Sequence, residues 1–200
     1  MRIESRLGVL GLVLAVAGAG AACAGNTENG EAGADAGAPA AAVAEKAAPT
    51  VDDAEIAAIV VAANRIDVRY GEIAKERAVD ERVKQFAQTM ITDHNAVNQS
   101  AAELVGRLGV TPRENDVSRS LESGADATRA SLMQKSGAAF DLAYIENEVA
   151  YHSAVLSAID DLLIPSAQNA ELKQTLVSVR PAIEAHLRHA ESLKRSLSGS

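Results

Sequence analysis

From Thr50 onward, apolar and polar residues alternate along this chain with the period of an α-helix. Apolar residues recur three and four positions apart, which places them on one face of each segment and makes that face suited to burial. The pattern divides into five predicted helices, over about residues 51–77, 80–108, 115–135, 138–163 and 169–197. The predicted fold class is therefore all-α.

Capping residues and prolines mark the ends of these helices. Thr50 with Asp53 predicts a capping box at the start of the first helix, and Pro165 predicts the end of the fourth. Pro181 lies inside the fifth predicted helix, where it removes a backbone hydrogen bond. We therefore expect a kink in that helix, about one turn before His186.

The third predicted helix, over residues 115–135, determines the expected topology. A helix of about twenty residues spans about 30 Å, so it can carry the chain from one end of a bundle to the other. The helices before and after it would then run parallel, as in single-crossover ferritin-like bundles. We predict a ferritin-like four-helix bundle with an extra short crossover helix over residues 50–200.

The N-terminal segment has the features of a targeting signal. Arg2 and Arg6 flank the start of an apolar run over residues 7–19, which is too short for a stable membrane span, and small residues then lead into Cys23. This ending resembles the lipobox of bacterial lipoproteins, in which the cysteine becomes the lipidated first residue. The resemblance implies a lipoprotein-type signal peptide over residues 1–22 and lipidation of Cys23. The alternative is an ordinary secretory signal that leaves the cysteine as a free thiol.

Residues 23–49 are acidic, of low complexity and almost free of large apolar side chains, which predicts a disordered tether. Ala24 follows the cysteine, in place of the Asp associated with inner-membrane retention in many Gram-negative bacteria. The lipoprotein resemblance therefore implies an exported protein, lipid-anchored in the cell envelope on the periplasmic side of the outer membrane. The membrane is the partner that this anchor implies.

Composition and charge exclude several classes of function. Nineteen Lys and Arg stand against twenty-seven Asp and Glu, and no basic stripe with interleaved aromatic residues is present, which argues against nucleic-acid binding. A single cysteine excludes a redox CxxC pair, and no phosphate-binding loop motif occurs. The identity of protein partners and the formation of a homo-oligomer stay open.

Five polar residues interrupt the apolar stripes of the predicted helices. They are Asp67, His94, Glu148, His152 and His186. Each histidine lies within about one turn of the midpoint of its helix, and helix midpoints lie at the same height whichever way each helix runs. Glu148 and His152 are four residues apart, so both side chains can reach a common point. The sequence therefore predicts one polar layer inside the bundle.

Two interpretations of this layer follow from its chemistry. Imidazole nitrogens with carboxylates suit a transition metal such as zinc, copper or iron. Alternatively, Asp67 and Glu148 accept hydrogen bonds from the three histidines and set the helix register without a ligand. Asp93 is a further candidate, either as an outer carboxylate or ligand or as a solvated residue. His189 forms an HxxH pair with His186, but it lies off the stripe and is interpreted as a surface residue.

Three stretches carry a family resemblance: IDVRYGEIAKERAVDERVKQFAQTMITDH, FDLAYIENEVAYH and VRPAIEAHLRHA. Together they resemble the exported bacterial family named domain of unknown function 4142, over about residues 52–197. The resemblance implies a ferritin-like bundle in the periplasm or cell envelope, without an established reaction. By this resemblance Asp67 stands where the family usually has Glu. The residues that match family positions are Asp93, His94, Asp141, Tyr144, His152 and His186.

The function we expect is that of a non-enzymatic cell-envelope lipoprotein that binds a transition metal. A metal-dependent oxidase is the enzymatic alternative, and a structural or interaction module without metal is a third. Ferritin-like di-iron sites use a Glu-x-x-His pair from each of two helices. Here Glu148 and His152 are separated by four positions instead of three, which argues against ferroxidase chemistry.

Overall fold

The computed structural model describes residues 50–199, so the predicted signal peptide, Cys23 and the tether lie outside the described residues. Within this range every regular element is helical, and none of the helices is both long and apolar enough to cross a membrane. The elements are α1 (Asp53–Arg77), α2 (Glu81–Leu108), α3 (Asp116–Met133), α4 (Gly137–Ala158), η1 (Ile159–Leu163), α5 (Ile164–Ser166) and α6 (Ala170–Ser198).

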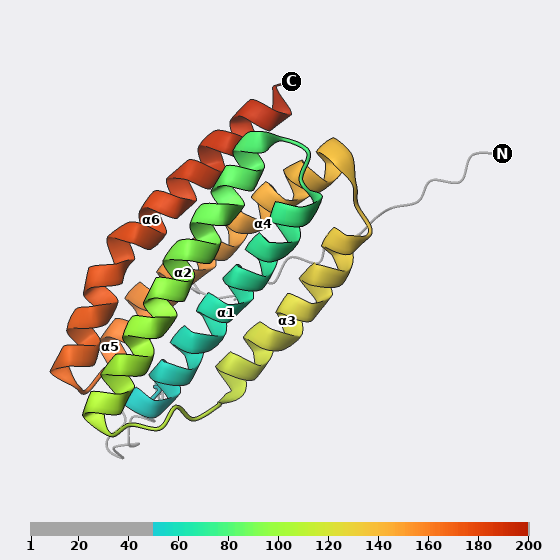
Figure 1. The fold of residues 1–200 in the computed structure, drawn as a ribbon. Helices are drawn as coiled ribbons and strands as arrows, with labels where there is room; N and C mark the ends of the chain where they lie inside the picture. The colour runs from blue at the N-terminus through green and yellow to red at the C-terminus, as the bar shows by residue number, and fades with distance from the viewer. Residues whose placement is uncertain (1–49, 200) are drawn as a thin grey trace, which may run out of the picture. The chain divides into compact units, whose positions relative to one another are not determined.

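Helices α1, α2, α4 and α6 form the bundle, and α3 lies along its outside beside α1 (Figure 1). Helices α1 and α3 run in the same direction. Asp52 pairs with Arg113 next to their starts, and Arg77 donates hydrogen bonds to the carbonyls of Met133 and Lys135 next to their ends. Helix α3 therefore carries the chain back to the end of the bundle where α1 ends and α2 starts. Because α4 starts at that same end, α2 and α4 run parallel. The ferritin-like bundle with a crossover helix is thus confirmed.

The apolar core consists of two clusters at different heights of the bundle. One is built around Phe86, Met90 and Phe140, and the other around Ile59 and Leu176. Burial of each large apolar side chain contributes about 1.5–3 kcal/mol, so these clusters supply most of the stabilisation. The predicted polar residues lie between the two clusters, where they interrupt an otherwise apolar interior.

The capping box predicted at Thr50 and Asp53 is wrong by two residues. Asp52 is the N-cap of α1 and accepts a hydrogen bond from Glu55 N at 2.9 Å, while the Glu55 carboxylate accepts one from Asp52 N at 3.0 Å. Glu is long enough to reach back to the N-cap, which the shorter Asp53 is not. Asp53 instead accepts hydrogen bonds from the backbone N–H groups of residues 168–169, which ties the start of α1 to the start of α6.

The helical backbone continues past the predicted stop at Pro165 as far as Ser166. It does so through the π-helical turn η1, in which Ile164 N–H bonds to the carbonyl of Ile159, five residues earlier. Pro165 occupies the first turn of α5, where a missing N–H is tolerated. In α6 the helix continues across Pro181.

Candidate metal centre

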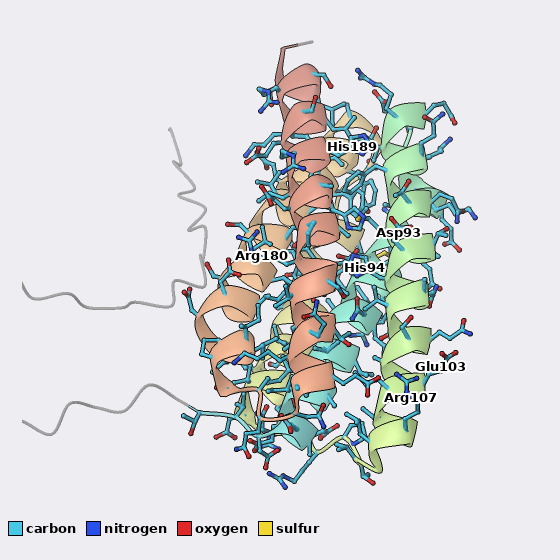
Figure 2. All side chains as sticks on the ribbon, turned by 90° about the vertical axis from the view of Figure 1, so that its left-hand side faces the viewer. Asp93, His94, Glu103, Arg107, Arg180 and His189 are labelled. Carbon is cyan, nitrogen blue, oxygen red and sulfur yellow. The ribbon has the colours of Figure 1, made fainter. Side chains whose placement is uncertain are left out.

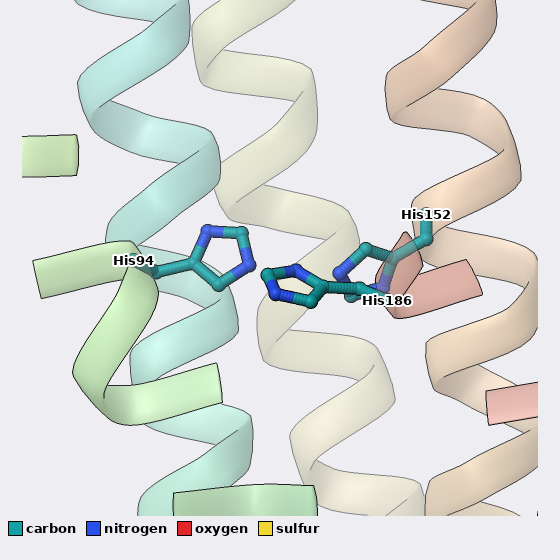
Figure 3. A group of neighbouring side chains, drawn as sticks. All are labelled: His94, His152 and His186. Carbon is teal, nitrogen blue, oxygen red and sulfur yellow. The ribbon is translucent and has the colours of Figure 1, made fainter. Parts of the chain in front are cut away.

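Helices α1, α2, α4 and α6 each bring polar side chains to the same point between the two apolar clusters. The structure places all five predicted residues there: Asp67 from α1, His94 from α2, Glu148 and His152 from α4, and His186 from α6. Each lies on the buried stripe of its helix, and none is more than 8 % exposed. Figure 3 shows the three imidazole rings side by side. Their centroids are 5.4, 5.5 and 5.6 Å apart.

One nitrogen of each imidazole is held by a hydrogen-bond acceptor. These contacts join His94 Nδ1 to Asn64 Oδ1 at 2.6 Å, His152 Nδ1 to the Glu148 carbonyl oxygen at 3.0 Å, and His186 Nε2 to Asp93 Oδ2 at 3.0 Å. Because each partner atom is an acceptor, the ring nitrogen facing it carries the hydrogen. The other nitrogen of each ring therefore presents a lone pair.

The nitrogens with lone pairs are those directed into the cluster. His94 Nε2, His152 Nε2 and His186 Nδ1 are buried and have no hydrogen-bond partner within the described residues. The three histidines offer ligand atoms within 4.8 Å of one another. Both carboxylate oxygens of Asp67 are also without a hydrogen bond, and its Oδ2 lies 3.3 Å from His94 Nε2 and 3.4 Å from His152 Nε2. An unsatisfied buried polar group costs about 1–3 kcal/mol, so a group of them at one point requires an explanation.

Burial makes the neutral forms of Asp67, Glu148, His94 and His152 the stable ones when no cation is bound. It raises the pKa of Asp67 to about 8, and burial together with Asp67 raises the pKa of Glu148 well above its usual value. Burial and the neighbouring imidazoles lower the pKa of His94 to about 3. For His152, burial lowers the pKa to about 4 against the opposing effect of its hydrogen bond to the Glu148 carbonyl. A bound cation would reverse this preference for the two carboxyl groups.

The geometry does not match a layer in which the histidines satisfy the carboxylate of Asp67. That interpretation needs N–H groups directed at Asp67, but the nitrogens nearest to it are Nε2 of His94 and of His152, and the hydrogen of each ring is on Nδ1, which donates to Asn64 Oδ1 or to the Glu148 carbonyl. A protonated Asp67 can donate only one hydrogen bond, whereas three lone pairs face the cluster. The arrangement is therefore one in which three imidazoles and a carboxylate can coordinate a metal ion.

Asp93 and His189, the two secondary candidates, have different positions. The side chain of Asp93 is 48 % exposed and holds His186 from outside the cluster, as an outer carboxylate does. His189 is exposed and packs the edge of its ring against Phe86 at 5.1 Å. Figure 2 shows both on the face where α2 and α6 meet, with His189 nearer the C-terminal end of α6. The HxxH pair is therefore split between an interior and a surface residue.

Sequence reasoning missed Asn64, which is 7 % exposed and orients His94. Its amide N–H donates to the Val60 carbonyl at 2.8 Å, which turns the amide oxygen toward the imidazole. The only signal in the sequence was its position on α1, three residues before Asp67 and hence on the same helix face. That spacing alone is common to many surface residues.

Asp141, which matches a position of the resembled family, lies outside the centre. It is 1 % exposed and accepts hydrogen bonds from the backbone N–H groups of Val79 and Asp80, at 3.1 and 2.8 Å. These two residues connect α1 to α2. Asp141 is thus a structural residue that fixes the α1–α2 connection on α4.

Comparisons with curated proteins and with solved structures found no match. The family model described as Domain of unknown function (DUF4142) matches residues 38–193. This span covers every residue of the centre, from Asp67 to His186, and the helices that carry them except the last five residues of α6. The chain belongs to the DUF4142 family.

Proposed function

We propose that this protein is a cell-envelope lipoprotein whose bundle binds one transition metal ion through His94, His152, His186 and Asp67. The observation that carries the proposal is the convergence of three buried imidazole lone pairs that have no hydrogen-bond partner within residues 50–199. The sequence features of residues 1–49 support the envelope location. Binding of the ion, rather than a reaction, is the function that this geometry supports best.

The distances around Asp67 suit ligands of a common ion. Imidazole and carboxylate ligands lie about 2.0–2.2 Å from zinc, which separates two ligands of a tetrahedral site by about 3.4 Å. Asp67 Oδ2 is 3.3 Å from His94 Nε2 and 3.4 Å from His152 Nε2. Three neutral nitrogens and one carboxylate suit zinc, copper or iron, and metal content has to decide among them.

Glu148 provides the second negative charge. Its Oε2 lies 3.4 Å from His152 Nδ1, and Asp67, Glu148 and His152 offer ligand atoms within 4.8 Å of one another. A buried divalent ion is costly unless nearby charges neutralise it, and two ionised carboxyl groups would do so. We assign Asp67 as a ligand and Glu148 as the carboxylate that balances the remaining charge.

Metal content of the full-length protein tests the proposal. The protein is purified without a histidine tag and compared with a His152→Ala, His186→Ala double variant by inductively coupled plasma mass spectrometry. We expect about one zinc, copper or iron per chain in the wild type and none in the double variant. The exposed His189→Ala substitution is the matched control and should keep the metal. Wild-type protein that is metal-free and does not take up added zinc, copper or iron would contradict the proposal.

A further inference from the structure

An apolar cavity of about 60 Å³ adjoins the histidine centre. Asp67, His94 and His152 form part of its wall, and most of the remainder consists of aliphatic side chains such as Ile59 and Ile183. A space of roughly 10–15 Å³ holds one water molecule, so this cavity can take a larger occupant. Asp67 is the only carboxylate in its wall.

A groove of about 260 Å³ runs between α2 and α6, on the face seen in Figure 2. Its lining is aliphatic, with polar groups only from Ser100, Thr175 and Ser178 and no charged side chain. Four residues line both the groove and the cavity: Val60, Val97, Leu176 and Val179. Only this aliphatic layer therefore separates the outer groove from the space beside the histidines.

Two helices lose a regular backbone hydrogen bond beside this cavity. The π turn η1 supplies Ile159 and Leu163 to the wall, and turns of this kind are frequent at functional sites. In α6, Pro181 follows Val179 by two residues and cannot donate a hydrogen bond to the preceding turn. Adjacent to both irregularities, the guanidinium of Arg180 binds both carboxylate oxygens of Asp160, at 2.7 and 2.8 Å. The wall is thus built where α6 and η1 depart from regular α-helical hydrogen bonding.

We propose that this cavity is a binding pocket for a small uncharged molecule of the size of dioxygen or nitric oxide, entered from the α2–α6 groove between Val97 and Val179. The aliphatic part of the wall favours an uncharged occupant, because it offers nothing that compensates the desolvation of an ion. The inference rests on the proposed metal centre, because two of its proposed ligands, His94 and His152, form part of the pocket wall and would face the occupant. The pocket itself is present without a metal.

Xenon binding to the full-length, chelator-treated protein tests the pocket without relying on a metal. Xenon is uncharged and occupies dry apolar cavities, and its binding is measured from the concentration dependence of the ¹²⁹Xe chemical shift. We expect saturable binding to the wild type and at least a tenfold loss of affinity in Val179→Phe, which fills the shared wall. Val177→Phe is the matched control on the same helix, because Val177 is 44 % exposed and lines neither space.

Val60→Phe fills the same wall from α1 and decides the question if Val179→Phe does not fold, which circular dichroism reports. No saturable xenon binding to the wild type, or wild-type affinity in the folded filling variants, would overturn the pocket. Metal content of the same protein, measured before the chelator treatment, separates the two proposals. Xenon binding by a protein that takes up no metal would support the pocket and contradict the metal centre. Metal uptake by a protein that does not bind xenon would contradict the pocket alone.

Discussion

Asp93 on α2 accepts a hydrogen bond from Nε2 of His186 on α6, at 3.0 Å. Nδ1 of the same ring is buried and has no hydrogen-bond partner among the described residues. The contact joins a half-exposed carboxylate to a residue that is 8 % exposed, so it marks the point where the centre approaches solvent.

Removing Asp93 should therefore weaken metal binding without removing a ligand. Outer partners of metal-binding histidines typically contribute about 10- to 100-fold in affinity. We expect a loss of that size in Asp93→Ala and a smaller loss in Asp93→Asn, which keeps an acceptor oxygen. Competition titration with a chromophoric chelator measures both. Glu103→Ala removes an exposed charge from the same helix, and an equal effect in that variant would refute the orienting role.

Asn64 should act on His94 in the same way. Asn64→Leu removes the acceptor at 2.6 Å from Nδ1 and frees the ring to turn, so we expect metal affinity to fall by about 10- to 100-fold. Asn64→Asp keeps an acceptor at this position and should retain more of the affinity. The same chelator titration compares the two variants, and equal losses would show that the hydrogen bond to His94 does not orient the ring.

Asp67→Asn should stabilise the metal-free protein more at high pH than at low pH. Burial raises the pKa of Asp67 from 3.8 in the unfolded chain to about 8, so the folded state binds the proton more tightly. The resulting stability is fully present below pH 4 and is lost as the pH rises to about 8, at up to about 1.4 kcal/mol per pH unit. The Asn variant lacks this loss.

Urea unfolding at pH 5, 7 and 9 in the presence of a chelator measures the difference. We expect the free energy of unfolding of the variant, relative to the wild type, to increase from pH 5 to 7 and to level off above pH 8. A difference that stays constant with pH would mean that Asp67 titrates normally in the folded protein. The variant should at the same time bind metal more weakly, since it lacks a carboxylate ligand.

Asp141→Ala should destabilise the protein and leave the metal centre intact. The substitution removes the acceptor of two backbone N–H groups at the α1–α2 connection, which we expect to cost about 1–3 kcal/mol in free energy of unfolding. Thermal unfolding measures the loss, and mass spectrometry measures the retained metal. Asp141→Asn keeps one acceptor oxygen and should lose less. Loss of metal from folded Asp141→Ala would instead show that this residue contributes to metal binding.

Gly71 allows α1 and α2 to pack closely. A Cβ atom there would lie 2.9 Å from Ile91 Cγ1 and 3.0 Å from the carbonyl oxygen of Ala87, so Gly71→Ala should destabilise the bundle by about 1–3 kcal/mol. Gly124→Ala in α3 is the matched control, because its Cβ would meet nothing within 4 Å. This control should stabilise the protein by about 0.5–1 kcal/mol through improved helix propensity. Urea unfolding of both variants checks the opposite signs.

The sequence by itself determined the helical architecture and the residues of the centre. Helical periodicity identified the buried stripes, and the length of residues 115–135 was enough to predict the crossover. His94, His152 and His186 were predicted to meet because each lies near the middle of its helix, and midpoints share one height in any bundle. These inferences depend only on the geometry of the α-helix, which is local.

Tertiary structure alone decided which nitrogen of each ring faces the cluster and what holds the ring there. The partners Asn64 and Asp93 depend on the rotation of each helix about its axis and on side-chain rotamers, which contacts between helices select. The π turn at Ile159–Leu163, which places both of these side chains in the core, likewise appears only in the tertiary structure. The sequence could supply the ligands, but only packing could orient their lone pairs toward one point.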